Sequence, residues 1–140
     1  MSGEHLFIDT TVLAHAMGGP SPRRTACQAL VARAASSELV LHASTEAVQE
    51  LLFHRMRVGD RDTAVVSARL VMGLCILHDV DREVMGRAID LVGATMLGGR
   101  EAVHAATALH HGFGSIVSAD RDFDGVPGLR RVDPAELTSE

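Results

Sequence analysis

The sequence predicts an α/β fold in which a mostly parallel central sheet of four or five strands is flanked by helices on both faces. Short apolar runs alternate with longer segments whose apolar residues recur at helical spacing, a pattern typical of parallel sheets. The first run, Leu6-Phe7-Ile8, leads directly to Asp9, so a carboxylate follows a buried strand. With 140 residues, 46% of them hydrophobic, the chain is expected to form a single domain, residues 1–140.

Five short apolar segments bounded by turn residues are the expected strands. They are residues 6–8, 39–41, 75–78, 115–118 and 129–132, the last being an edge strand after the turn Val126-Pro127-Gly128. Right-handed crossovers between parallel strands place their carboxyl ends at one edge of the sheet. Residues that follow the strands are therefore expected to lie near one another, where ligands bind in open α/β sheets.

The segments between these runs carry the start and stop signals of helices. A short helix after Asp9 is stopped at Gly18, later helices end at Gly59 and Gly112, and a sixth begins at Arg100-Glu101. Polar residues before periodic apolar segments are expected to be N-caps, because their side chains accept bonds from free backbone amides. The expected caps are Ser21 and Ser44, helices are expected to start at Asp60 and Asp81, and Asp133-Pro134-Ala135-Glu136 has the form of a capping box for a final turn.

Composition restricts the class of protein. No apolar run reaches the length of about 20 residues that a membrane span needs, and Met1 to Glu4 carry no basic region of a signal peptide, so we expect a cytoplasmic protein without a membrane partner. Cys27 and Cys75 are expected to be buried free thiols. The net charge is −5, and the chain has four Phe and no Trp or Tyr, so a general basic or aromatic nucleic-acid surface is not expected.

Carboxylates follow two of the expected strands and stand in two otherwise apolar helices. Asp9 follows the first strand and Asp120 the fourth, with Asp122 close behind, while Glu50 and Glu101 lie in helices. Two unit charges ~4 Å apart at an effective dielectric of ~20 repel by about 4 kcal/mol, so such a cluster needs protons, arginines or a hard cation. Mg²⁺ and Mn²⁺ prefer oxygen ligands, and two such ions can activate water and stabilise a leaving phosphodiester oxygen.

Each acid also has a plain structural alternative. Asp9 can serve only as an N-cap, Glu50 as a solvated helix residue, and Glu101 as a first-turn acid that complements the helix dipole. Spacing alone does not decide which of Asp120, Asp122 and Asp124 belongs to the cluster. These alternatives stay open at the level of the residues.

Four segments together resemble a known family. They are Ile8-Asp9-Thr10-Thr11-Val12, Thr45-Glu46-Ala47-Val48-Gln49-Glu50-Leu51, Arg100-Glu101-Ala102-Val103-His104-Ala105-Ala106 and Val117-Ser118-Ala119-Asp120-Arg121-Asp122-Phe123. In this order and spacing they resemble the motifs of PIN-domain ribonucleases, and most closely the VapC-type toxins of VapBC toxin–antitoxin pairs. The resemblance covers nearly the whole chain and implies a single PIN-like domain.

The resemblance also implies a function and its residues. It implies a Mg²⁺- or Mn²⁺-dependent endoribonuclease toxin, with one or two ions per site, an RNA substrate, inhibition by a cognate VapB-like antitoxin, and a homodimer or toxin–antitoxin hetero-oligomer. The metal ligands carried over are Asp9, Glu101 and Asp120. The full catalytic set is Asp9, Glu50, Glu101, Asp120 and Asp122, supported by the polar residues Thr10, Thr11 and Ser118.

Glu101 departs from the family pattern, which usually has Asp at this place. The charge is kept, but the carboxylate moves by one methylene, so a catalytically attenuated or inactive PIN-like binding module is the alternative function. His104, one helical turn after Glu101, is the histidine to test at the site. Arg55, Arg57 and Arg61 form the densest basic cluster, either an RNA-phosphate track or a solvated helix end.

Overall fold

The computed structural model describes residues 3–137 and contains five parallel strands. Three of them form one ladder in the order β1-β2-β3, and β4 pairs with β5 in a second. A parallel bridge between Ile8 and Val117 joins β1 to β4, so the strands follow one another as β3-β2-β1-β4-β5. Their bounds are β1 Glu4–Phe7, β2 Leu39–Ser44, β3 Cys75–His78, β4 Ser115–Val117 and β5 Arg130–Val132.

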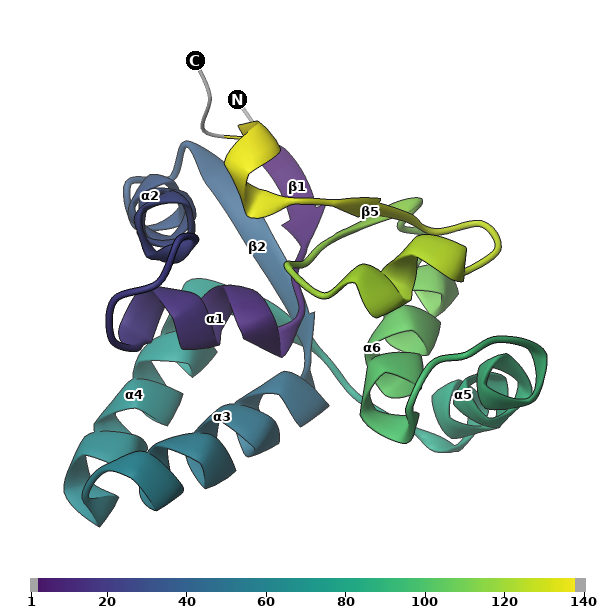
Figure 1. Ribbon diagram of the computed structural model, residues 1–140, viewed down its shortest axis with the longest axis horizontal. Helices are drawn as coiled ribbons and strands as arrows, with labels where there is room; N and C mark the ends of the chain where they lie inside the picture. Colours follow the sequence, from purple (N-terminus) through teal and green to yellow (C-terminus); the bar gives the residue numbers. More distant parts are fainter. Residues whose placement is uncertain (1–2, 138–140) are drawn as a thin grey trace.

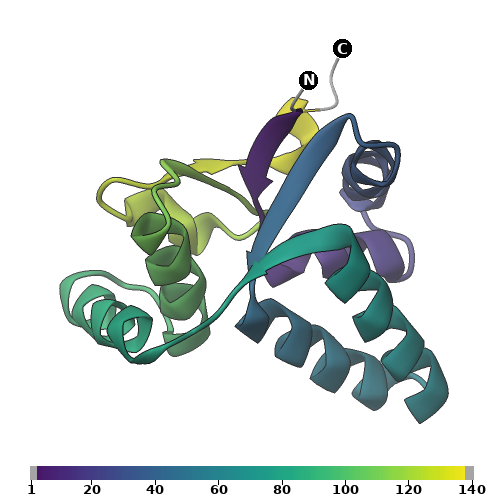
Figure 2. The same cartoon turned by 180° about the vertical axis from the view of Figure 1, so that it is seen from behind.

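Helices cover both faces of this sheet, as the sequence predicts (Figures 1 and 2). Helices α1 to α4 lie together on one side, whereas α5, α6 and the 3₁₀ helix η1 lie on the other. The bounds are α1 Thr10–Met17, α2 Arg24–Ala35, α3 Thr45–Val58, α4 Arg61–Leu74, α5 Arg82–Ala94, α6 Gly99–His110, η1 Arg121–Gly125 and η2 Pro134–Leu137.

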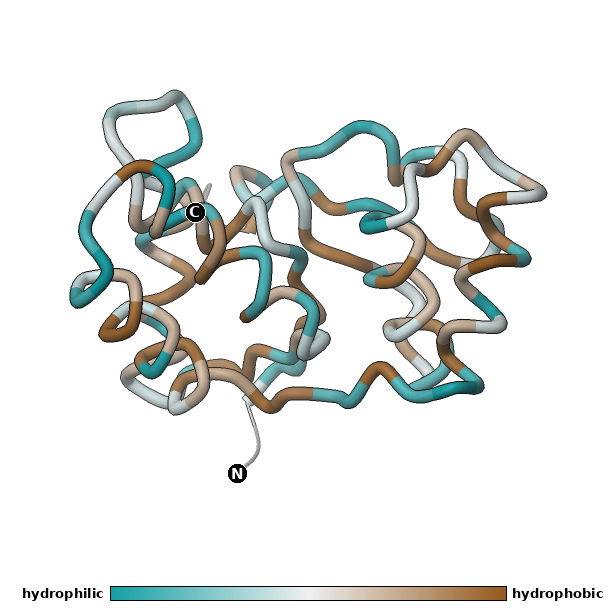
Figure 3. The backbone as a smooth tube through the Cα atoms, turned by 90° about the horizontal axis from the view of Figure 1, so that it is seen from below, coloured by the Kyte–Doolittle hydropathy of each residue, from teal (hydrophilic) through white to brown (hydrophobic). Residues whose placement is uncertain are grey.

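Alternation along β1 divides the core between the two faces. Leu6 and Ile8 belong to the cluster beneath α1–α4, whereas Phe7 belongs to the cluster beneath α5 and α6. This division follows from the twofold period of a strand, which sends successive side chains to opposite faces. The helices are correspondingly amphipathic, with apolar and polar residues alternating along their turns (Figure 3). Cys27 and Cys75 are free and buried, as expected.

The predicted helix starts at Asp60, Asp81 and Asp133 are confirmed, whereas two predicted side-chain caps are wrong. Asp60 and Asp81 cap α4 and α5 through Thr63 N and Val84 N, and the capping box at Asp133 forms, since Glu136 accepts from the Asp133 amide at 2.8 Å.

Ser21 and Ser44 do not cap. Helix α2 begins at Arg24, and the Ser21 hydroxyl instead lies 3.0 Å from His15 Nδ1. Ser44 stands at the N-cap position of α3, but its hydroxyl contacts His104. In both cases a histidine from a distant or neighbouring element takes the hydroxyl that local sequence would assign to the helix.

No helix within residues 3–137 has the length and apolarity needed to cross a membrane.

A ladder of histidines crosses the strands on the Phe7 face. His5 Nδ1 lies 2.7 Å from His42 Nε2, and His42 Nδ1 lies 2.9 Å from His78 Nε2. His111 stacks on His78 with ring centroids 4.2 Å apart, and Phe113 packs against the same rings. Burial, followed by the neighbouring histidines, lowers the pKa of His42 to about 4, so His42 is neutral at pH 7.

We expect the ladder to make stability depend on pH. The folded pKa of His42 lies below its usual 6.5, so its contribution is complete above pH 6.5 and is lost as the pH falls toward 4. His42→Gln removes this titration together with the ladder bonds. The destabilisation that it causes at pH 7.5 should therefore shrink by about 2 kcal/mol at pH 4.5. Urea unfolding of both proteins at the two pH values measures this change. A difference in stability between the two proteins that does not depend on pH would contradict the lowered pKa of His42.

Candidate active site

The site lies where the carboxyl ends of β1, β2 and β4 meet. Asp9 comes two residues after β1, Ser44 ends β2, and Ser118 follows β4. The amide of Asp9 donates to the carbonyl of Val117 at 3.2 Å, which fixes the two strand ends side by side. The parallel sheet thus brings together residues that are more than 100 positions apart in the sequence.

Asp9 is the buried centre of this edge. Its carboxylate is 3% exposed and accepts from the Thr11 hydroxyl at 2.6 Å, the Thr11 amide at 3.2 Å and the Ser118 hydroxyl at 2.7 Å. The bond from the Thr11 amide caps α1, so Asp9 also serves as the N-cap that the sequence offers as its structural alternative. Burial nevertheless outweighs these bonds and the nearby His104, and it raises the pKa of Asp9 to about 6.

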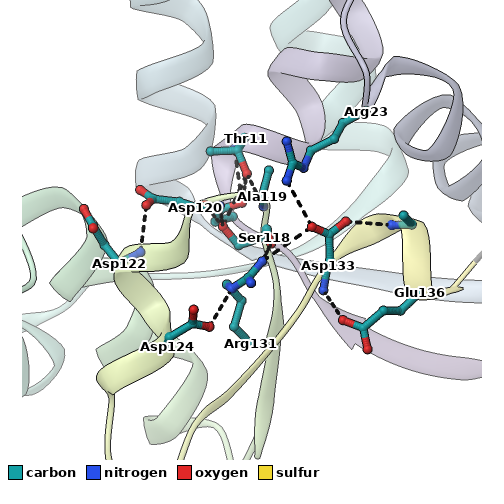
Figure 4. Close-up of polar contacts among 12 residues, drawn as sticks. Thr11, Arg23, Ser118, Ala119, Asp120, Asp122, Asp124, Arg131, Asp133 and Glu136 are labelled. Atoms are coloured by element: carbon teal, nitrogen blue, oxygen red, sulfur yellow. Dashed lines mark hydrogen bonds and ion pairs between the residues drawn. The ribbon is translucent and has the colours of Figure 1, made fainter.

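Ser118 connects Asp9 to the backbone of Asp120. Figure 4 shows Ser118 beside Asp120 and Asp122. The Asp120 amide donates to Ser118 Oγ at 2.9 Å, while the Asp120 carboxylate accepts from the Asp122 amide at 2.9 Å and caps η1. The Asp122 side chain is exposed, and Asp124 is paired with Arg131 at 2.7 Å. Of the acids that the sequence leaves open, Asp120 is therefore the one whose backbone amide is joined to Asp9 through Ser118.

Glu50 belongs to a second network at the same edge. Its Oε1 accepts from Thr10 Oγ1 at 3.1 Å and from Nε2 of the buried His104 at 2.5 Å. His104 Nδ1 lies 2.9 Å from the buried hydroxyl of Ser44, and Arg100 lies 3.9 Å from Glu50 Oε2. Burial acts to raise the pKa of Glu50, but the bond and charge of His104, together with Thr10 and Arg100, bring it below its usual value.

Glu101 stands apart from both networks. It occupies the first turn of α6, and a Cβ added to Gly98 would lie 2.5 Å from Glu101 Oε1, so its carboxylate folds over the start of its own helix. Within residues 3–137 no hydrogen bond or ion pair reaches it. A negative charge in a first helical turn is favourable, which matches the structural alternative for this residue.

The donors at this edge are of the oxygen type that a hard divalent cation prefers. Among the described residues no three His, Cys, Asp or Glu side chains are grouped as a metal site. Mg²⁺, however, keeps several waters and is often held by one or two carboxylates. Asp9 and Asp120, whose amide is joined to Asp9 through Ser118, supply two such carboxylates at one strand edge. Within residues 3–137, Asp9 is buried and has no cationic hydrogen-bond partner. The chemistry of these donors fits a hard cation.

Two residues of the site were not anticipated from the sequence. The sequence predicts Ser44 only as a helix cap, but Ser44 also ends a strand, and this position is a signal for the site. Arg100 pairs with Glu50, which lies 50 positions away, so the pairing has no local signature in the sequence. His104, by contrast, is at the site as expected.

The fold and its acidic strand edge define an α/β domain with a carboxylate site at one end of a parallel sheet. The family model of the PIN domain matches residues 6–129, and the chain belongs to this family. Ribonuclease VapC7 of Mycobacterium tuberculosis is 33% identical over 132 residues, which cover 92% of this chain and 91% of that protein.

Solved structures share the fold. VapC20 of M. tuberculosis, described as a toxin that cleaves the sarcin–ricin loop, has a TM-score of 0.72 at 18% identity, covering 89% of this chain and 98% of that one. VapBC2 from Rickettsia felis, solved with a DNA fragment from its promoter, has a TM-score of 0.70 at 12% identity, covering 92% and 99%. These similarities confirm the predicted PIN-like architecture.

We expect Asp9 to destabilise the cation-free protein at neutral pH. Its folded pKa of about 6 exceeds the usual 3.8, so the stability linked to its proton is complete below pH 4 and is lost as the pH rises through 6. The loss amounts to about 3 kcal/mol by pH 7.5. With chelator present, Asp9→Asn should therefore be more stable than wild type at pH 7.5 and gain nothing below pH 4. A variant that is less stable than wild type at pH 7.5 would contradict this.

Proposed function

We propose that this protein is a divalent-metal-dependent endoribonuclease of the VapC toxin type. It would hydrolyse RNA phosphodiester bonds with Mg²⁺ or Mn²⁺, one or two ions per site. Support comes from the family, from the 33% identity to a VapC ribonuclease and from the acidic strand edge. The single observation that carries the proposal is Asp9, a carboxylate kept in the interior at the carboxyl end of the sheet.

The residues divide into distinct roles. Asp9, Asp120 and Glu101 would hold the cation, with Thr11 and Ser118 orienting the Asp9 carboxylate. Bound there, Mg²⁺ or Mn²⁺ supplies Lewis acidity toward water and the scissile phosphate. Glu50 is kept ionised by His104 and Thr10 and would accept a proton or orient water, and Asp122 is a second, exposed acid at the rim.

The proposal extends to partners. VapBC2 from R. felis and the DNA-bound VapBC from Salmonella typhimurium are toxin–antitoxin structures of this fold. We infer a VapB-like antitoxin as the partner, in a homodimer or a toxin–antitoxin hetero-oligomer. An antitoxin guanidinium can pair with the carboxylates in place of the cation. A cytoplasmic location follows from the RNA substrate.

The direct test is RNA cleavage. Wild type should cleave RNA with added Mg²⁺ or Mn²⁺ and stop with chelator. Asp9→Asn should lose at least about 100-fold in rate, because several kcal/mol of charge stabilisation is removed. As a readout independent of activity, Mn²⁺ should raise the unfolding temperature of wild type and not of Asp9→Asn. Cleavage that persists with chelator, or in Asp9→Asn, would overturn the mechanism.

Glu101 separates an active enzyme from the binding-module alternative. We expect Glu101→Gln to raise the metal concentration for half-maximal cleavage about tenfold or more, because a charge near the cation is lost. Glu101→Asp keeps the charge and should keep cleavage. A large gain in Glu101→Asp would mean that the native site is attenuated by its longer side chain. Absence of cleavage in both wild type and Glu101→Asp would favour a non-catalytic PIN-like module.

A further inference from the structure

Two adjoining hollows open beside the acidic edge. One has a volume of about 250 Å³ and is lined by residues that include Thr10, Thr11 and Glu50 from the site. The other has a volume of about 230 Å³ and extends past Glu46. Glu50, Phe53 and Arg100 line both, so the surface continues directly from the second hydrogen-bond network toward solvent.

Phe53 is an unusual residue for this surface. Its side chain is 54% exposed, whereas Phe7 and Phe123 are fully buried. The Arg57 guanidinium carbon lies 5.7 Å from the Phe53 ring centroid, which places a cation against the ring. A single exposed ring is compatible with the aromatic-poor composition, and every nucleobase has a face that can stack on it.

Positive charge flanks this ring. Arg57 is exposed and Arg100 is 65% exposed, and both line the larger hollow. Guanidinium groups bind phosphate oxygens as a fork, which suits a polyanion that must approach an acidic site. Arg55 belongs to the predicted basic cluster but has a different role from Arg57. It donates to the carbonyl of Met17 at 3.3 Å and connects α3 to α1.

We propose that Phe53, Arg57 and Arg100 form a subsite for a nucleotide next to the scissile phosphate of an unpaired RNA segment. The base stacks on Phe53, and the flanking phosphates pair with the two arginines. An unpaired segment is required, because a base inside a duplex cannot present its face to a side chain. This subsite rests on the proposed ribonuclease function and adds substrate positioning to it.

The test uses RNA that cannot be cleaved. Binding of a mixed-sequence single-stranded oligoribonucleotide is measured in the Asp9→Asn background with Mg²⁺. Phe53→Ala should raise the Kd about 5- to 100-fold. Phe53→Leu, which keeps the apolar bulk without the ring, should also raise the Kd. Arg57→Ala and Arg100→Ala should each reduce the salt dependence of binding by roughly one phosphate contact. The matched control is Ile89→Ala, which removes a side chain that is 66% exposed on α5 and lines neither hollow.

Cleavage by the otherwise wild-type enzyme separates this subsite from the proposed function. Phe53→Ala should raise KM while kcat at saturating RNA changes by less than about twofold, because uniform binding is lost. Unchanged KM and Kd in Phe53→Ala would overturn the subsite even if metal-dependent cleavage is found, and would leave the surface to a protein partner. Loss of binding in Phe53→Ala in a protein that never cleaves RNA would support the subsite and overturn the enzyme.

Discussion

The burial of one carboxylate constrains this fold more than any other interaction. Asp9 is placed in the interior by the strand that precedes it, and removing its charge from water is costly. The hydroxyls of Thr11 and Ser118 and the Thr11 amide reduce this cost, and the two residues come from α1 and from the end of β4. The junction of β1 with β4 is therefore required both for the sheet and for the solvation of Asp9.

The pKa values of two carboxylates at this edge shift in opposite directions. Burial raises the pKa of Asp9, whereas His104 and Thr10 bring the pKa of Glu50 below its usual value. Acids whose environments separate their pKa values in this way are suited to different roles in one site. Glu50 keeps its charge without help from a ligand, whereas Asp9 gains most from an added cation. The two hydrogen-bond networks thus prepare one edge for both positioning and charge compensation.

Much of the fold was predictable because its signals are local. The strands follow from short apolar runs, and the helices from apolar spacing with Asp caps, such as Asp60, that lie beside the amides they bind. The wrong predictions concern side chains whose partner lies far away in the sequence. Ser44 is 60 positions from His104, so nothing near it indicates that its hydroxyl is taken. Likewise, the sequence predicts that Asp9, Glu50 and Asp120 lie at one edge. It does not predict that the Glu101 carboxylate folds over Gly98.

The arginines explain how an acidic protein can present a cationic surface. With a net charge of −5 and no lysine, the chain depends on thirteen arginines, and several are committed to internal contacts. Arg23 and Arg131 both pair with Asp133 beneath the edge, and Arg33 donates to the carbonyl of Leu137. Arg57 and Arg100 differ, because they line an open hollow and contact only a ring face and, at 3.9 Å, one carboxylate. Arg57 and Arg100 therefore place positive charge directly beside the acids of the strand edge, where the proposed phosphate contacts would lie.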